Sequence, residues 1–279
     1  MPKISIVTPC YNAEKYITKT IESLCASTFT DWEHVVVDDG SSDNSAEIVL
    51  NYAKKEPRLR LIQQPNGGVC NARNNGFKAC SLESEYLLFL DQDDYVEPQM
   101  LEIMVKYLDK HPDVGLAYCD HWLIDIEDKI IESPSFPRFY PDSKGFKEVP
   151  YETPETPVFS IAVGACLESC CVLRKSIYVK TSGWPEWLGQ GREGNDLFLH
   201  MALLSNAHFV PRKLYKYRQH TTQAHKSIDD QAQIDKLIAR WKEGKGLTPE
   251  QKGKVAEVLE YIPAFEKFLY SRDELYLSA

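Results

Sequence analysis

Three aspartates, Asp91, Asp93 and Asp94, follow directly on a short apolar run. The run, residues 86–90, reads Tyr-Leu-Leu-Phe-Leu, which is typical of a strand buried on both faces. Like charges so close together repel one another, and their removal from water is costly. A hard divalent cation such as Mg²⁺ or Mn²⁺ would hold such a cluster together, whereas a solvated acidic turn would leave it in water. The motif alone is compatible with a metal site and with a solvated acidic turn.

Apolar, strand-like runs alternate with helical patterns over the first 120 residues. Strands are predicted at residues 4–8, 34–38, 59–63, 86–91 and 114–119. Strands that are apolar throughout, each followed by a helix, predict a parallel sheet covered on both faces. The expected fold class is therefore α/β with a Rossmann-like sheet, in which ligands bind beyond the carboxyl ends of the strands.

Polar turns follow three of these strands, at residues 8–11, 38–41 and 91–94. Because the carboxyl ends of parallel strands lie along one edge of a sheet, the three turns are expected to converge. Asp39 could accept a hydrogen bond from the imide N–H of uracil or thymine. Alternatively, Asp38 or Asp39 bonds its own backbone, as is common in Asp-Gly turns. The convergence is stronger evidence for a binding site than any single turn.

Arg73 is the basic candidate near this edge. It lies one turn into a predicted helix that follows Gly67 and Gly68, where glycine lets the backbone approach a ligand closely. Its guanidinium could bind a diphosphate through two parallel hydrogen bonds, or it could be an ordinary surface arginine.

Asp196 and His220 are candidates from the second half of the chain. Asp196 stands at the start of a predicted helix, either as a plain helix cap or as a carboxylate aimed into a cleft, and Glu193 competes with it for a catalytic role. His220 follows a predicted strand near Leu214 and could be a neutral metal ligand, a phosphate contact or a structural residue.

Composition limits the partners. The net charge of −9 argues against nucleic acid, so a nucleotide diphosphate would need a metal and local basic groups. The eight cysteines form no paired CxxC motifs, which predicts reduced thiols rather than a zinc site. The sequence shows no stretch suited to spanning a bilayer and no room for a signal peptide before the first strand, so a cytoplasmic location is expected.

The pattern changes after residue 132. Residues 133–156 are rich in proline and predict a long loop, whereas residues 164–172 look strand-like. Beyond residue 227 the chain reads as a helical tail, with a capping box at Thr248–Gln251. We expect this tail to pack onto the main domain; a dimer contact or peripheral membrane docking is the alternative.

The chain resembles glycosyltransferase family 2, the inverting nucleotide-sugar transferases with the A-type fold, over about residues 3–227. The resemblance is carried by residues 6–12, 37–43, 66–69, 72–74 and 89–94. It implies a catalytic domain at 1–227, with a nucleotide-sugar-binding half at 1–120 and an acceptor half at 121–227. Residues 228–279 would be a helical extension.

The resemblance also implies roles for individual residues. It assigns nucleotide contacts to Thr8, Pro9, Tyr11, Asp39, Arg73, Asp91 and Gln92. It implies that Asp93, Asp94 and His220 are the ligands of Mn²⁺ or Mg²⁺. Asp196 would be the general base, in a motif that departs from the family pattern because Asn195 replaces the usual glutamate.

The resemblance implies metal-dependent, inverting transfer of a sugar from a nucleotide-sugar, with UDP favoured, to a hydroxyl of a carbohydrate or lipid-linked acceptor. This would serve polysaccharide or glycoconjugate synthesis. A nucleotidyltransferase is disfavoured because residues 9–12, Pro-Cys-Tyr-Asn, are not a basic, glycine-rich loop for a triphosphate. A non-catalytic nucleotide-sugar-binding module remains an alternative because of Asn195.

Overall fold

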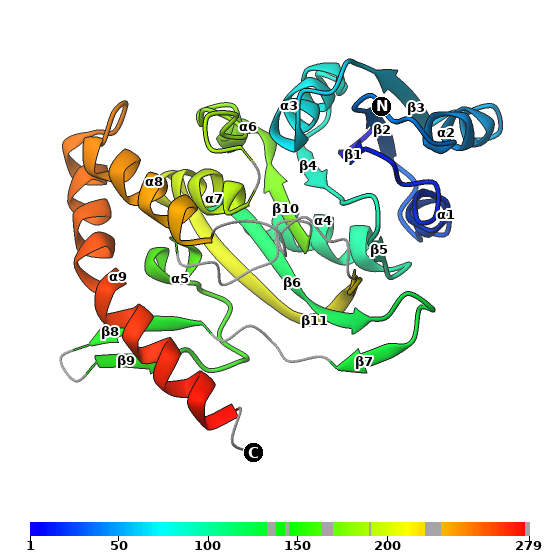
Figure 1. Ribbon diagram of the computed structural model, residues 1–279. Helices are drawn as coiled ribbons and strands as arrows, with labels where there is room; N and C mark the ends of the chain where they lie inside the picture. The colour runs from blue at the N-terminus through cyan, green and yellow to red at the C-terminus, as the bar shows by residue number, and fades with distance from the viewer. Residues whose placement is uncertain (133–137, 143–144, 163–169, 190, 221–229, 277–279) are drawn as a thin grey trace.

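The computed structural model describes residues 1–132, 138–142, 145–162, 170–189, 191–220 and 230–276, as an α/β arrangement (Figure 1). Its strands are β1 (Ile4–Cys10), β2 (Trp32–Asp38), β3 (Leu59–Gln63), β4 (Tyr86–Phe89), β5 (Tyr95–Val96), β6 (Val114–Ile124), β7 (Ile130–Glu132), β8 (Phe139–Asp142), β9 (Gly145–Glu148), β10 (Cys171–Arg174) and β11 (Asn206–Arg218). Its helices are α1 (Ile17–Cys25), α2 (Ser45–Ala53), α3 (Val69–Ala79), α4 (Met100–Lys110), α5 (Val158–Ala162), α6 (Lys175–Tyr178), α7 (Glu193–Leu204), α8 (Asp230–Glu243) and α9 (Pro249–Tyr276).

The central sheet has the strand order β3-β2-β1-β4-β10-β6-β11-β5, with β7 paired to β6. The first four strands are parallel, as their strand–helix alternation predicts. The second half differs from the prediction, because β10 runs antiparallel to both β4 and β6. These antiparallel pairings make the sheet mixed rather than wholly parallel.

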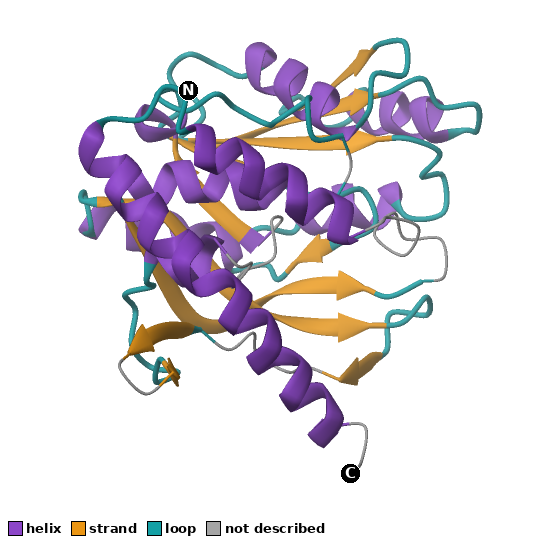
Figure 2. Ribbon diagram, turned by 60° about the vertical axis from the view of Figure 1, so that its left-hand side comes forward, coloured by secondary structure: helices purple, strands orange, loops and turns teal. Residues whose placement is uncertain are grey.

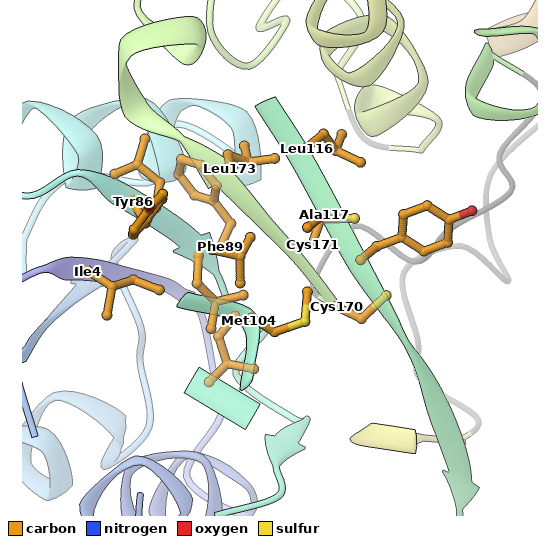
Figure 3. Close-up of a cluster of buried hydrophobic side chains, with 14 of the residues drawn as sticks. Ile4, Tyr86, Phe89, Met104, Leu116, Ala117, Cys170, Cys171 and Leu173 are labelled. Carbon is orange, nitrogen blue, oxygen red and sulfur yellow. The ribbon is translucent and has the colours of Figure 1, made fainter. Parts of the chain in front are cut away.

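The main core lies between this sheet and its helices. Ile4, Tyr86, Phe89, Met104 and Leu116 are among its side chains, which meet from different strands and from α4 in Figure 3. Seven cysteines lie in the described part of the chain, and none of these seven is in a disulfide; the eighth, Cys166, lies outside the described residues. Burial raises the pKa of the Cys10 thiol to about 12 and that of Cys80 to about 11, so both are unreactive core residues.

The proline-rich segment is more ordered than the predicted long loop. Its described residues include the β8–β9 hairpin, and α5 follows it. Arg138 is buried and donates hydrogen bonds to the carbonyl oxygens of Pro150 (2.8 Å) and Tyr151 (2.9 Å). A single arginine thus satisfies backbone acceptors that lack strand or helix partners, a tertiary effect that residue periodicity does not show.

The C-terminal helices pack onto the main body, as the apolar stripe of the tail predicts. A second apolar cluster joins α8 and α9 to α5 and α7 through Phe139, Phe159, Ala162, Leu188, Leu199, Leu203, Leu237, Trp241, Val255, Val258 and Ile262. In Figures 1 and 2, α8 lies beside α7, and α9 runs from there toward the C-terminus. Within the described residues, no helix is both long enough and apolar enough to cross a membrane.

Candidate active site

The three predicted polar turns lie at one edge of the sheet and are joined by hydrogen bonds. The backbone N–H of Tyr11 donates to Oε1 of Gln92 (2.6 Å), which links the turn after β1 to the turn after β4. The N–H of Ser42 donates to Oδ1 of Asn12 (2.8 Å), which links the same first turn to the turn after β2. The predicted convergence is therefore confirmed, because parallel strands bring their carboxyl ends to one edge.

Asp39 organises the glycine turn that precedes α3. Its carboxylate accepts hydrogen bonds from the backbone N–H groups of Gly67 (2.8 Å) and Gly68 (2.9 Å), and from Nε2 of Gln64 (2.7 Å). Gly68 has a φ of +86°, which favours glycine at this position. Asp38 is the member of the pair that bonds its own turn, since it accepts from the N–H of Ser41.

Thr8 and Pro9 are buried within β1, so the exposed member of this predicted group is Tyr11, whose side chain is 48% exposed. The Thr8 hydroxyl lies 2.8 Å from Nε2 of His34 on β2. Burial lowers the pKa of His34 to about 3, so the imidazole is neutral and pairs with the hydroxyl inside the sheet. The Thr8 side chain therefore braces β1 against β2.

Arg73 connects the edge of the sheet where the polar turns meet to α7. It contacts Oδ1 of Asp91 through Nη2 (2.8 Å) and Oε1 of Glu193 through Nη1 (3.2 Å), and it lies over the ring of Trp184. Its side chain is 3% exposed, so it is not the ordinary surface arginine of the alternative prediction. A buried guanidinium with two carboxylate partners is fixed in orientation.

Asp93 and His220 lie side by side, although 127 positions separate them in the sequence. Nε2 of His220 is 2.8 Å from Oδ2 of Asp93, and the His220 ring stacks on Tyr16. Arg218 strengthens this junction, because its Nε donates to the backbone carbonyl of Asp93 (2.8 Å). The end of β11 thereby meets the aspartate motif that follows β4.

This pair of side chains fits a divalent metal that is shared with a substrate. A carboxylate oxygen and an imidazole nitrogen suit Mn²⁺, and Mg²⁺ also binds commonly through one or two carboxylates plus substrate phosphates. The described residues hold no cluster of three or more His, Cys, Asp or Glu ligands, so the remaining ligands would be phosphate oxygens and water.

Asp94 has a structural environment rather than that of the predicted metal ligand. It is 1% exposed; one carboxylate oxygen accepts from the Tyr215 hydroxyl and the other from the Arg218 N–H (2.8 Å). Burial, followed by the charges of Asp93 and Asp91, raises the pKa of Asp94 well above its ordinary value. Both oxygens thus anchor β11, which favours Asp93 and His220 over Asp94 as metal ligands.

Asp196 lies in the first turn of α7 and is 3% exposed. Its Oδ1 accepts a hydrogen bond from Nε1 of Trp241 on α8 (2.9 Å), and its Oδ2 is 3.7 Å from Nδ1 of His200. The neighbouring Asn195 donates to the carbonyl oxygen of Ala162 at the end of α5 (2.8 Å), so the departure from the family pattern has a structural use here.

Sequence reasoning missed Trp184 and Trp241. Trp184 covers the guanidinium of Arg73, and Trp241 contacts Asp196 from a helix that begins 34 residues further along the chain. A lone tryptophan in an apolar pattern carries no sign of such a partner. His225, a weaker candidate than His220, lies outside the described residues.

Comparison with solved structures shows which fold this chain shares. The S. aureus protein TarS, residues 1–349 in complex with UDP-GlcNAc, superposes with a TM-score of 0.70 at 22% sequence identity, over 92% of this chain and 71% of TarS 1–349. At this identity the likeness shows the fold alone, and it confirms the predicted fold class.

The family follows from sequence comparison. The family model for glycosyl transferase family 2 matches residues 5–180, and the chain belongs to that family. EpsJ of Bacillus subtilis (strain 168), an uncharacterized glycosyltransferase, is 42% identical over 106 residues, which cover 38% of this chain and 30% of EpsJ. A chondroitin synthase of Escherichia coli is 34% identical over 133 residues, 48% of this chain and 19% of the synthase. The chain therefore matches less than a third of either relative's length.

Proposed function

We propose that this protein is a metal-dependent, inverting glycosyltransferase that moves a sugar from a UDP-sugar to an acceptor hydroxyl. The observation that carries the proposal is the contact of Arg73 with both Asp91 and Glu193. It joins the sheet edge where a nucleotide would bind to the helix turn that carries Asp196. The helix turn that carries the candidate base is thereby tied to the sheet edge through Glu193.

The nucleotide-sugar donor would lie along the edge formed by the carboxyl ends of β1, β2 and β4, which we call the donor edge. Tyr11 and Asp39 would flank the nucleoside, and Thr8 and Pro9 would support the turn from within β1. Asp91 and Gln92 would contact the ribose. The Arg73 guanidinium pairs with both Asp91 and Glu193. We therefore propose that its main role is to orient Asp91 beside the diphosphate. The UDP-GlcNAc in the TarS structure supports a UDP-sugar as the first donor to test.

Asp93 and His220 would hold the metal together with the diphosphate. When bound, Mn²⁺ or Mg²⁺ would neutralise negative charge on the leaving nucleotide diphosphate. The net charge of −9 makes such neutralisation necessary, because this acidic protein otherwise repels a diphosphate.

Asp196 is the proposed general base. The acceptor hydroxyl loses its proton to the Asp196 carboxylate, and its oxygen bonds to the anomeric carbon as the bond from that carbon to the diphosphate oxygen breaks. One such displacement inverts the anomeric centre. The competing Glu193 is already paired with Arg73 at 3.2 Å, whereas Asp196 forms no ion pair with an arginine or lysine of the described residues, so we assign the role to Asp196. Such proton transfer contributes typically about 10²–10⁴-fold in rate.

The proposed roles of the individual residues also suggest a function for each part of the chain. Residues 1–120 would bind the donor, residues 121–227 would bind a carbohydrate or lipid-linked acceptor, and residues 228–279 would form a helical extension. Synthesis of a polysaccharide or glycoconjugate is the proposed setting, supported by the chondroitin synthase relative. Six of the seven described cysteines are buried and none of the seven is in a disulfide, which supports the proposal of a reducing, cytoplasmic compartment; a peripheral contact with the membrane would suit a lipid-linked acceptor.

The test combines binding and turnover. We expect UDP, UDP-GlcNAc and other UDP-hexoses to raise the melting temperature in Mn²⁺ but not in EDTA, and GDP-mannose to have a smaller effect. With the donor so identified, release of UDP should accelerate with an oligosaccharide acceptor. Stabilisation by UDP-sugars without UDP release across a broad acceptor panel would indicate a binding module instead. Absence of any stabilisation by nucleotides would contradict the proposal.

A further inference from the structure

Helix α7 is buried on two sides, and Asp196 lies on the side of the C-terminal extension. Leu197, Phe198 and Met201 belong to the main core, whereas Leu199 and Leu203 belong to the cluster formed with α8 and α9. Positions 196, 199 and 203 are spaced three and four residues apart, so they share one face of the helix. The candidate base therefore faces α8 rather than the sheet.

Trp241 is the α8 residue that meets this face. It is 5% exposed and belongs to the same apolar cluster as Leu237, Val255 and Val258. Its Nε1–H donates to Oδ1 of Asp196 at 2.9 Å. A buried carboxylate without a donor is costly, and a hydrogen bond to a charged group is worth more than one between neutral groups. The indole therefore has both the packing and the chemistry to fix the orientation of Asp196.

We propose that Trp241 is a positioning residue for Asp196, so that the C-terminal extension completes the catalytic site. This inference rests on the proposed function of Asp196 as the base. The indole holds Oδ1, and the carboxylate is then oriented so that Oδ2 is the oxygen that accepts the acceptor's proton. His200 and Glu193 are the titratable neighbours on α7 itself; Nδ1 of His200 is 3.7 Å from Oδ2, beyond hydrogen-bond distance.

The decisive variant is Trp241→Phe, which keeps an aromatic ring in the cluster and removes the N–H donor. We expect kcat for sugar transfer to fall at least about tenfold, because small misplacements of a catalytic group have effects of this size or larger. The KM for the UDP-sugar and the affinity for UDP in Mn²⁺ should stay within about twofold of wild type, since Trp241 acts on the base and not on the donor edge.

Leu237→Ala is the matched packing control. Leu237 lies in the same cluster and on the same helix, and its side chain carries no hydrogen-bond donor. We expect this variant to lower the melting temperature but to leave kcat within about twofold of wild type when assayed well below that temperature. An equal loss of kcat in both variants would overturn the proposal, because packing alone would then explain it.

Two further outcomes separate this inference from the proposed function. If Trp241→Phe turns over like wild type while Asp196→Asn is inactive, the positioning role is wrong and the base assignment stands. If Asp196→Asn remains active, the base assignment itself fails. Should Trp241→Phe not fold, the ¹⁵N-labelled indole N–H signals of the five tryptophans provide a second test. One of them should shift in Asp196→Asn, and five unchanged signals would overturn the contact.

Discussion

The donor edge and helix α7 are built in different ways. At the donor edge, Tyr11, Asp39 and Asp91 each follow the end of a strand, and hydrogen bonds such as Tyr11–Gln92 and Asp39–Gly68 join neighbouring turns. On α7, the candidate base depends on partners that are remote in sequence, because Arg73 holds Glu193 and Trp241 holds Asp196. The comparison indicates that the strand ends of a parallel sheet suffice to gather the proposed nucleotide-binding residues, whereas the proposed catalytic carboxylate needs two separate cores to place it.

The sharpest test of this division is Asp196→Asn. We expect transfer to fall by about 10²–10⁴-fold, because the amide cannot take the acceptor's proton. UDP affinity in Mn²⁺, measured by calorimetry, should stay within a few-fold of wild type. Glu193→Gln is the control, and it should retain far more activity. The reverse ranking of the two variants would make Glu193 the base.

The connection between the two regions is tested by Arg73→Met. This change leaves the Glu193 carboxylate, which is 8% exposed, beside Asp91 without their shared cation. We expect the free energy of unfolding to fall by about 3 kcal/mol or more, measured by urea denaturation. Arg60→Met is the control: Arg60 pairs with Glu33 near the surface and is 46% exposed, so its loss should cost less than about 1 kcal/mol. Equal losses would show that Arg73 does not connect the two regions.

Metal binding at the donor edge is tested by Asp93→Ala and His220→Ala. We expect each variant to lose most of the Mn²⁺-dependent gain in UDP affinity, about tenfold or more for removal of a ligand or its immediate support. Asp31→Ala, next to β2 at the opposite end of the sheet, should bind UDP like wild type. Unchanged Mn²⁺-dependent binding in Asp93→Ala would refute the proposed metal site.

The smallest predicted effect concerns His34, which lies within the donor half but away from the proposed chemistry. Its pKa is about 3 in the folded protein and about 6.5 when unfolded, so the unfolded chain binds the extra proton as the pH falls below about 6.5. The folded state therefore loses stability toward acid, by about 1 kcal/mol at pH 5.5 from this group alone. Urea denaturation at pH 8 and pH 5.5 should show this loss in wild type and not in His34→Gln. Parallel curves for the two proteins would contradict it.

Much of the donor edge could be predicted because its residues are fixed by strand ends. The aspartates at 91–94 follow a strand that is buried throughout, and the turn at 38–41 follows another. The individual roles were less predictable, since Asp93 and Asp94 are adjacent in sequence. Asp94 points to Tyr215 and Arg218, and Asp93 meets His220, a distinction that depends on where β11 lies.

The second half of the fold was harder to predict for a similar reason. Residues 138–162 contain a hairpin and a short helix, and Arg138 holds the irregular backbone between them at Pro150 and Tyr151. Strand β10 enters the sheet antiparallel between β4 and β6. The hairpin has no local periodic pattern. The strand-like run predicted at residues 164–172 overlaps β10 at its end, although residues 163–169 lie outside the described part of the chain, and it gave no sign of the antiparallel direction. Both depend on contacts between segments that are far apart in the chain.

Strand-forming runs and the polar turns that follow them settled the α/β class, the convergence of the turns at one edge of the sheet and the family resemblance, because hydrophobic periodicity and turn chemistry act over a few residues. The packing of segments that are far apart in the chain decided which carboxylates are buried and which of them pair with Arg73. It also brought Trp241 into contact with Asp196. Charge pairing and desolvation depend on distances through space, and those distances exist only after the sheet and the C-terminal helices have packed together.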